Sequence, residues 1–581
     1  MAKAIFSVGP VLSFRGTEGG TWRVTALVGV KEGTKLPKLH IEGRECAPPR
    51  VLLNHDRLMI ARYDLSCAQG AKERVVQYGM TGTDLSWEFS VPAKRQSPRI
   101  AFVSCNGFSD PASLRKLAKP ENAVWQDLLS NHDKQLREPG YLLDKEQLWH
   151  EQRIHDAGNK RFQLLCMGGD QIYFDSIWED IAALKAWVGL SRQAQLSFKV
   201  SAALEREIES YYFGLYATRW LPTKRRTWGS RQPNRDGADA LARIPTVMMW
   251  DDHDIFDGWG SYSPAMQHCE LFQVLMRHAR RAFWVFQMQH ALEDLPPLQP
   301  LKRDNVSQQD PQFEPVAWSK QLKNDPLALP LLDNQPGFSF AHRIAALALW
   351  VADLRTERSR TQIMSSSTWR AAQQWLEVAP AEHGKTQHVL MMSSVPVAHP
   401  KLSLAEGLLD TFGQDHVLDS NADDLKDHWA HDDHEGERKR LLESLLQVAE
   451  RQNLRVSILS GDVHVAAWGT CYRRDVAPTA NWAQIQQFTA SGVVHPSLIG
   501  VAERLFLHVL NSTATTVQAI DVQHCVQMLL FPGHNRYIMA ARNWLALELD
   551  EGGEAKLWAT WRCEGDSGFS NHLQAVAPAQ R

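Results

Sequence analysis

Four short apolar runs of this 581-residue chain end in side chains that can bind a metal ion. Carboxylate, imidazole, thiolate and phenolate groups are all metal ligands, and two cations bridged by one carboxylate form a hydrolytic centre for phosphate esters. The pattern therefore predicts a metal site built from strand ends. The ligand-type residues are Cys105, then Asp170 with Tyr173, then Asp252 with His253, and finally Asp462 with His464.

Each of these ends also has an ordinary structural explanation when it is taken alone. Asp170 follows two glycines and could cap the next helix after a turn. Cys105 could be a buried packing residue, and residues 251–254 could be a solvated acidic helix start. Residues 461–464 could form a simple turn. The joint occurrence of all four at strand ends favours a site, because clustered carboxylates repel one another unless a cation lies between them.

The elements that must position these residues follow an alternating pattern. Short apolar runs bounded by turn residues are typical of buried strands, and helical patterns lie between them. Strands that alternate with helices favour an α/β fold, and in a doubly wound sheet all four ends would lie along one edge. With the polar residues that end them, the strand runs cover residues 99–107, 164–175, 246–254, 345–355, 388–396 and 456–464, and the helical patterns cover 123–155, 179–218, 266–292 and 437–452.

The two ends of the chain differ in composition. Residues 1–97 contain short strands separated by Gly, Pro, Asn and Asp, which predicts a small N-terminal β-sandwich. Residues 92–98 are a plausible linker, and residues 98–581 form the second predicted domain. Within it, residues 293–337 are rich in Pro, Gln and Asp and predict an irregular insertion.

Composition limits the classes of partner. The net charge of −3 provides no basic field for nucleic acid or an acidic membrane surface, and the longest apolar run is too short to span a bilayer. The N-terminus contains neither an uninterrupted apolar core nor a twin-arginine pair, so a cytoplasmic location is expected. The eight cysteines form no Cys-x-x-Cys pair, and their spread argues against a disulfide framework.

Three motifs together resemble the PhoD-like (alkaline phosphatase D) branch of the calcineurin-like metallophosphoesterases. The resemblance covers about residues 98–565 and implies a four-layer α/β/β/α core around a dimetal site, with phosphomonoesterase or phosphodiesterase activity on a small-molecule phosphate ester. The motifs are Gly169-Asp170-x-x-Tyr173, Trp250-Asp251-Asp252-His253-Asp254 and Ser460-Gly461-Asp462-Val463-His464, with support from Ser104-Cys105, Asp353-Leu354-Arg355-Thr356, Gln374-Trp375-Leu376 and Gln487-Phe488-Thr489-Ala490-Ser491.

The resemblance also implies a role for each residue. Asp170 would bridge two metal ions, and Fe³⁺ would be the first ion because a hard ferric centre suits the phenolate of Tyr173. Cys105 and His464 would complete that ligand set. Asp252, which stands where many relatives have Asn, would hold the second ion, Ca²⁺, together with Asp462. His253 would contact the phosphate or protonate the leaving group.

Two features depart from the family pattern. Exported PhoD enzymes carry a twin-arginine signal that is not visible here, and Met167-Gly168-Gly169 replaces the usual apolar-Gly pair before the aspartate. No histidine ligand is assigned from the run at residues 388–396, and nearby His399 is interpreted as a loop residue.

Other functions stay open on the sequence alone. The chain could be a binding or scaffold protein, in which the N-terminal domain recognises a partner and the phosphoesterase domain is catalytically silent. A nucleic-acid enzyme is a weaker alternative, because no basic stripe interleaved with aromatic residues is present. The substrate and the oligomeric state are not determined. Specificity is expected in residues 222–243 and 293–337, where Lys224-Arg225-Arg226 could be a phosphate clamp or a solvated loop.

Overall fold

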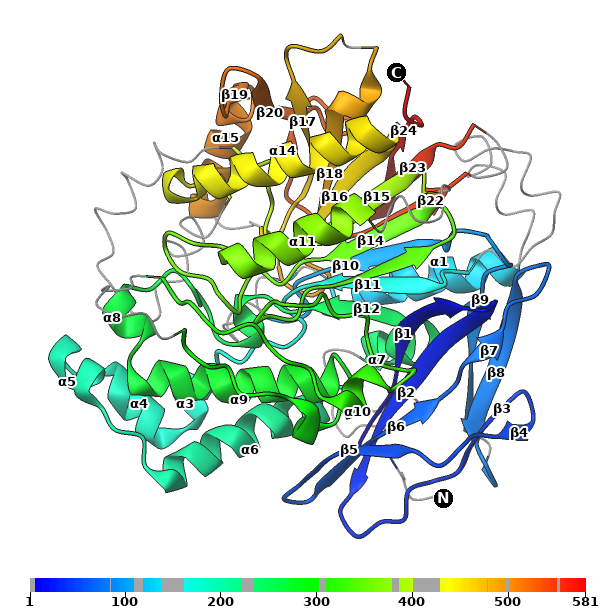
Figure 1. Cartoon of the computed structure of the whole chain (residues 1–581), viewed down its shortest axis with the longest axis vertical. Coiled ribbons are helices and arrows are strands. Elements are labelled where there is room, and N and C mark those ends of the chain that lie inside the picture. Colours follow the sequence, from blue (N-terminus) through cyan, green and yellow to red (C-terminus); the bar gives the residue numbers. More distant parts are fainter. Residues whose placement is uncertain are drawn as a thin grey trace.

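The buried apolar runs of the sequence become the central strands of two large β-sheets in a mixed α/β structure (Figure 1). A smaller four-stranded sheet lies near the N-terminal strands. The computed structural model describes residues 6–83, 85–108, 117, 119–137, 161–220, 235–301, 310–378, 386–400, 429–477, 479–496, 501–550 and 554–580.

The first sheet has eleven strands, and its centre is parallel: β10, β11, β12 and β1 run in the same direction. Both faces of these central strands are buried, which explains their nearly continuous apolar sequences. In order across the sheet the strands are β24 (Gly568–Val576), β23 (Leu557–Gly565), β22 (Asn543–Leu549), β10 (Ile100–Val103), β11 (Leu164–Gly168), β12 (Thr246–Met249), β1 (Val8–Glu18), β2 (Thr21–Lys31), β6 (Leu58–Asp64) and β5 (Arg50–His55), with β7 (Cys67–Ala68) beside β2.

The second sheet has nine strands, of which β14, β15, β16 and β18 are parallel. Its order is β13 (Phe340–Ile344), β14 (Leu347–Val351), β15 (His388–Ser393), β16 (Arg455–Ser460), β18 (Gln484–Ala490), β17 (Ala466–Arg473), β20 (His524–Leu529) and β19 (Gln518–Ala519), with β21 (Ile538–Met539) beside β17. The four-stranded sheet has the order β4 (Arg44–Glu45), β3 (Leu39–Ile41), β8 (Arg74–Met80) and β9 (Ser86–Val91).

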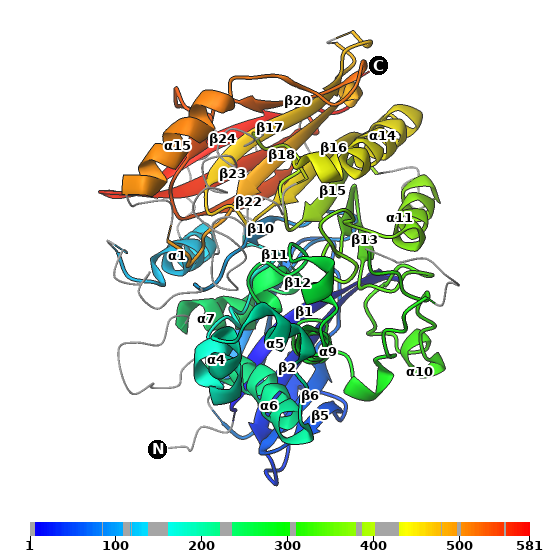
Figure 2. The same cartoon turned by 90° about the vertical axis from the view of Figure 1, so that its left-hand side faces the viewer.

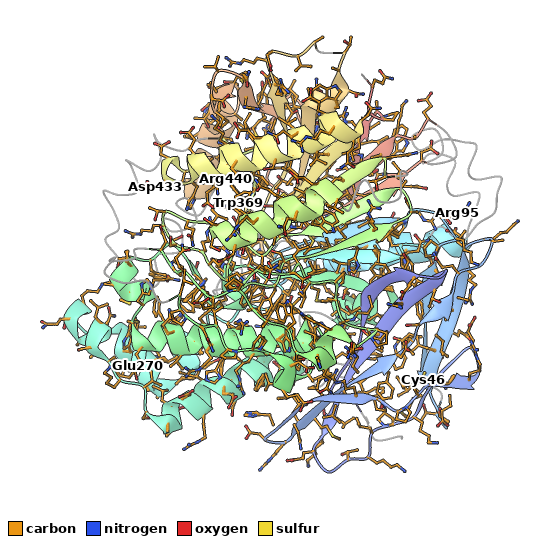
Figure 3. The ribbon with its side chains drawn as sticks, in the orientation of Figure 1. Cys46, Arg95, Glu270, Trp369, Asp433 and Arg440 are labelled. Atoms are coloured by element: carbon orange, nitrogen blue, oxygen red, sulfur yellow. The ribbon has the colours of Figure 1, made fainter. Side chains whose placement is uncertain are left out.

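The helices lie outside the two large sheets (Figures 1 and 2). On the nine-stranded sheet, the guanidinium of Arg440 in α14 (Glu435–Gln452) lies 5.5 Å from the ring centre of Trp369 in α11 (Ser366–Val378) (Figure 3). The longer helices are α1 (Ala123–Arg137), α6 (Ala202–Arg219), α7 (Arg235–Arg243), α9 (Glu270–Phe286), α11 (Ser366–Val378), α14 (Glu435–Gln452) and α15 (Val501–Thr513). The short ones are α3 (Ile177–Asp180), α4 (Ala182–Val188), α5 (Arg192–Ser197), α8 (Pro264–Gln267), α10 (Lys320–Lys323), and the 3₁₀ turns η4 (Asp252–Asp254), η5 (Leu292–Asp294), η6 (Asp432–His434) and η7 (Asn481–Ala483).

The two large sheets pack against each other through aromatic side chains. Phe488 of β18 meets Trp561 of β23 edge to face, with ring centres 5.5 Å apart, and both rings are fully buried. The indole of Trp561 also donates a hydrogen bond of 2.9 Å to the carbonyl of Thr489. A layer of this kind excludes water between the sheets and fixes their relative position.

The predicted N-terminal β-sandwich is not confirmed, because residues 1–97 do not pair only among themselves. Strand β1 pairs in parallel with β12, and Ser13 lies opposite Thr246. The hydroxyl of Thr246 donates to the carbonyl of Leu12 at 2.7 Å. Alternation of apolar and polar residues predicts that a strand exists, but its partner is chosen by long-range packing. Strands β1, β2, β5, β6 and β7 therefore extend the eleven-stranded sheet, while β3, β4, β8 and β9 form the four-stranded sheet.

The predicted insertion at residues 293–337 is irregular where it is described, apart from α10 and a 3₁₀ turn. Asp325 ties it to the N-terminal strands, because its carboxylate accepts from Arg62 at 2.5 Å and from Arg50 at 3.2 Å. All eight cysteines are free thiols in the structure. Among the described helices, none has both the length and the apolar character needed to cross a bilayer.

Candidate metal centre

The predicted ligand residues lie immediately beyond the ends of four parallel strands. Cys105 follows β10, Asp170 follows β11, Asp252 follows β12 and Asp462 follows β16. These ends converge, but the expectation that they share one sheet edge is wrong. Three of the strands belong to the eleven-stranded sheet and β16 belongs to the other, so the site lies where the two sheets meet.

The backbone is strained at these strand ends. Cys105, Asp170, Asp462 and His464 have φ angles of 56°, 56°, 68° and 52°, a left-handed conformation that ordinary side chains rarely adopt. Each such residue costs on the order of 1 kcal/mol and persists where the surrounding structure enforces it, often at functional sites. Gly169 is needed for the same turn, because a Cβ there would lie 2.6 Å from the Cβ of Asp251.

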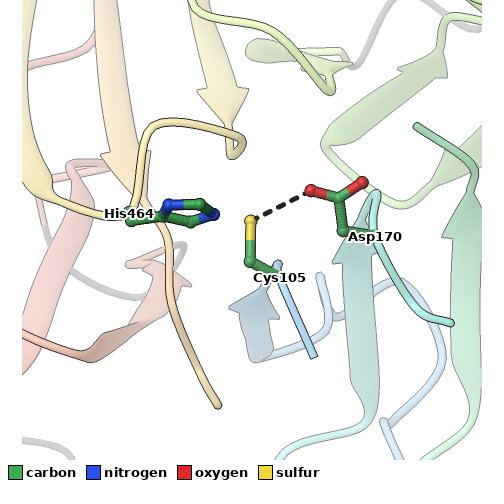
Figure 4. A group of neighbouring side chains, drawn as sticks. All are labelled: Cys105, Asp170 and His464. Atoms are coloured by element: carbon green, nitrogen blue, oxygen red, sulfur yellow. Dashed lines mark hydrogen bonds between the residues drawn. The ribbon is translucent and has the colours of Figure 1, made fainter. Parts of the chain in front are cut away.

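Three groups of ligand-type side chains overlap at one residue. Within each group the ligand atoms lie within 4.8 Å of one another, and Asp170 belongs to all three. Figure 4 shows the first group, in which the thiol of Cys105 lies between the ring of His464 and the carboxylate of Asp170, with Sγ 3.3 Å from Oδ2. The groups are Cys105 with Asp170 and His464; Asp170 with Asp252 and His253; and Asp170 with Asp251, Asp252 and Asp462.

The donor atoms of this cluster fit cations. Oδ1 of Asp170 and the phenol oxygen of Tyr173 are buried and form no hydrogen bond with a described residue. A buried oxygen without a partner is costly, whereas a cation would satisfy it. Burial raises the pKa of Asp170 well above its usual range, and the nearby carboxylates of Asp251 and Asp252 raise it further while His253 lowers it. A bound cation would offset both the cost of burying this carboxylate and its repulsion by the neighbouring ones.

Aromatic rings stack along one side of the cluster. The ring of Tyr173 lies 4.3 Å from His253 and 5.9 Å from His495, and His495 stacks on His464 at 3.5 Å. Burial lowers the pKa of His464 well below its usual value, and the neighbouring His495 and His253 add to that effect. His464 is therefore a neutral imidazole, the form that binds metals.

His253 has the opposite protonation state. Its Nδ1 lies 2.8 Å from the Oδ2 of Asp175. Burial lowers the pKa of His253, but the carboxylates of Asp175, Asp252 and Asp170 outweigh burial and raise the pKa well above its usual value. The imidazolium can donate a proton from Nε2 while Asp175 fixes the ring through Nδ1.

Arg355 is a second buried cation of this region. Its guanidinium is fully buried, pairs with Asp251 and Asp252, and donates from Nη1 to the carbonyl of Trp259 at 3.0 Å. The pair with Asp252 measures 3.3 Å. Arg355 therefore orients one candidate ligand and neutralises the carboxylate beside it.

Sequence reasoning placed Cys105, Asp170, Tyr173, Asp252, His253, Asp462 and His464 in this site, and the structure brings all seven together. It missed Asp175, Asp251 and His495, and it gave Arg355 no role. The signal for His495 was available, because Ser491 and His495 follow the end of β18 as the other candidates follow their strands. His399 is buried and lies outside the three groups.

The fold and the site together define an α/β protein with a candidate metal centre at the ends of its parallel strands. The chain belongs to the family described as PhoD related phosphatase, whose model matches residues 80–302 and 403–528. This confirms the PhoD-like resemblance.

A relative in Saccharomyces cerevisiae, the uncharacterized protein YGR266W, is 27% identical over 453 residues, which are 72% of this chain and 57% of the yeast protein. The chain thus matches little more than half the length of that relative.

Proposed function

We propose that the chain is a metal-dependent phosphoric ester hydrolase that acts on phosphomonoesters or phosphodiesters of small molecules. The observation that carries the proposal is the position of Asp170, which is shared by three ligand groups and has a buried oxygen without a hydrogen-bond partner among the described residues. Membership of the PhoD related phosphatase family supports the reaction class.

The proposal includes the architecture expected for such an enzyme. Helices α11 and α14 cover the nine-stranded sheet, and α1 and α7 pack against strands of the eleven-stranded sheet, as a four-layer α/β/β/α core requires. The domain boundary at residue 97 and the cytoplasmic location stay predictions.

We assign the ligands in two sets that share Asp170. Cys105, Tyr173 and His464 would hold the first ion, for which Fe³⁺ is proposed because of the phenolate. Asp252 and Asp462 would hold the second, for which Ca²⁺ suits an all-oxygen set. When bound, the two ions would supply a hydroxide near neutral pH and neutralise the phosphate oxygens for in-line attack on phosphorus.

The remaining chemistry belongs to side chains of this chain. His253 would donate its Nε2 proton to the leaving oxygen, and Asp175 would hold the ring in place through Nδ1. Arg355 would keep Asp252 directed into the site. The stacked rings of Tyr173 and His253 would fix the distance between the first ligand set and the proton donor.

Substitution of Asp170 tests the hydrolase directly. Asp170→Asn should lower hydrolysis of 4-nitrophenyl phosphate and bis(4-nitrophenyl) phosphate by at least about a thousandfold, because it removes the shared carboxylate. Metal content of the same preparations should fall below two ions per chain. Asp56→Asn, in an exposed turn, is the matched control. Undiminished turnover in Asp170→Asn would contradict the proposal, and an inactive, metal-free parent protein would favour the scaffold alternative.

Colour tests the iron assignment separately. Fe³⁺ bound to the phenolate of Tyr173 should give a visible charge-transfer band, which Tyr173→Phe should abolish. Colourless, iron-free protein with full activity would reject iron and leave the hydrolase intact.

A further inference from the structure

A cavity lies at the end of β16 that is farther from the candidate metal centre. It has a volume of about 680 Å³ and is bounded by β17, β18, β20 and the C-terminal residues 574–577. Strand β16 begins at Arg455, which lines the cavity, and ends at Ser460, just before the candidate ligand Asp462. At about 3.3 Å per residue the two sites are separated by roughly 16 Å.

The lining of this cavity carries positive charge and no carboxylate. Three arginines and four glutamines contribute to it, together with the aromatic side chains of Trp468 and Tyr472. Its volume lies within the range of about 300–1,000 Å³ that is typical of small-molecule sites.

Arg455 is the distinctive residue of the cavity. Only 4% of it is exposed, its Nε has no hydrogen-bond partner, and no ion pair joins it to any residue that the structure describes. Burial alone lowers its pKa to about 10, so the guanidinium stays charged at neutral pH. A buried cation without a counter-charge is unfavourable, and an oxyanion accepting two parallel N–H bonds is the partner that guanidinium groups prefer.

The neighbouring arginines differ in their availability. Arg473 is already paired with Asp475 at 2.6 Å and with Glu450 at 3.2 Å. Arg474 is exposed at the rim of the cavity, and the described part of the chain supplies no ion pair for its side chain. Arg455 and Arg474 can therefore both face a bound anion.

Polar groups on the wall complete a site for a larger ligand. The indole of Trp468 donates to the Oε1 of Gln486 at 2.8 Å, and the amide of Gln486 reaches the hydroxyl of Thr470 at 3.4 Å. Gln484 and Gln527 add further carboxamides to the lining. Carboxamides beside aromatic faces bind the polar and planar parts of small metabolites.

We propose that this cavity binds a small organic anion, whose phosphate or carboxylate group pairs with Arg455 and whose body lies against Trp468 and Tyr472. The site is distinct from the proposed catalytic centre and does not depend on it. Its ligand would be held far from the hydrolytic reaction.

Binding is tested in the full chain carrying Asp170→Asn, which disables the catalytic centre as a competing anion site. Inorganic phosphate and citrate are titrated by calorimetry, and the better probe shows whether the anionic group is a phosphate or a carboxylate. One saturable anion should bind per chain. Arg455→Gln should weaken binding at least about tenfold, and Arg474→Gln about threefold, because each removes a charge-assisted contact.

Arg206→Gln, on the exposed surface of α6, is the matched control and should leave binding unchanged. Arg455→Gln in the otherwise unaltered chain should keep phosphatase activity, which verifies its fold. Arg474→Gln keeps the proposal testable should the buried substitution unfold the protein. Equal binding by the parent and both cavity variants would overturn the proposal, as would the absence of binding by both probes at millimolar concentration.

Discussion

The two ends of strand β16 differ in the sign of the charge that is buried there. At the Ser460 end, the carboxylates of Asp170, Asp251, Asp252 and Asp462 crowd together, and Arg355 and the imidazolium of His253 neutralise only part of their charge. At the other end, Arg455 lies in a cavity whose lining has no carboxylate. One end has an excess of anions and the other an excess of cations, and the proposed metal ions and organic anion would each supply the opposite charge.

Glu357 is a third buried ionisable group, two residues after Arg355 in the sequence. Glu357 is 3% exposed and accepts a hydrogen bond of 2.5 Å from the hydroxyl of Thr368. Burial raises its pKa to about 7, so it is about half protonated near neutrality, and a proton takes the place of a counter-ion. The ion pair of Arg355, the ligand proposed for Arg455 and the proton on Glu357 each reduce the cost of a buried charge. Substitution of these three residues should therefore change the stability of the protein in three different ways.

Removing the internal counter-ion should have the largest effect on stability. Arg355→Met leaves Asp251 and Asp252 buried without their guanidinium, and we expect the free energy of unfolding to fall by about 3–5 kcal/mol in urea denaturation. Arg277→Met, which removes an exposed pair with Glu205, should cost no more than about 1 kcal/mol. Similar losses in the two variants would show that the buried pair is not the stabilising element.

Glu357 should make the free energy of unfolding depend on pH. The pKa of Glu357 is higher in the folded chain than in the unfolded chain, where it is about 4.3. Its contribution is therefore fully present below about pH 4 and is lost as the pH rises through 7. Glu357→Gln cannot ionise, so between pH 5 and 8.5 its free energy of unfolding should rise relative to that of the parent protein by about 3 kcal/mol. A difference independent of pH would place the pKa near its ordinary value.

Substitution of Arg455, the buried cation without a counter-charge, should change the free energy of unfolding least. Arg455→Met in anion-free buffer replaces an unpaired charge by an apolar side chain of similar length. We expect the free energy of unfolding to change by less than about 1 kcal/mol or to increase. Adding citrate or phosphate should stabilise the parent protein and leave Arg455→Met unaffected. A loss as large as that of Arg355→Met would show that Arg455 acts as a structural residue.

Much of the candidate site could be predicted because its chemistry is local in the sequence. Gly169-Asp170-x-x-Tyr173 contains a turn and two oxygen ligands within five residues, and Asp252-His253 and Asp462-x-His464 are equally compact. Asp175 and His495 were missed because their importance comes from contacts with residues far away in the chain. Asp175 matters through the ring of His253, and His495 matters through its stacking on His464.

The sequence by itself determined which short runs become buried strands and which side chains follow them, because apolar periodicity and glycine turns are local signals. Only the tertiary structure decided how these strands are shared between sheets. It joined β1 to β12, and it brought Asp462 from a second sheet to Asp170 of the first. It also paired Arg355 with Asp251 and left Arg455 without a carboxylate in its cavity. Strand partners and buried charge pairs depend on packing between distant segments, which no local pattern specifies.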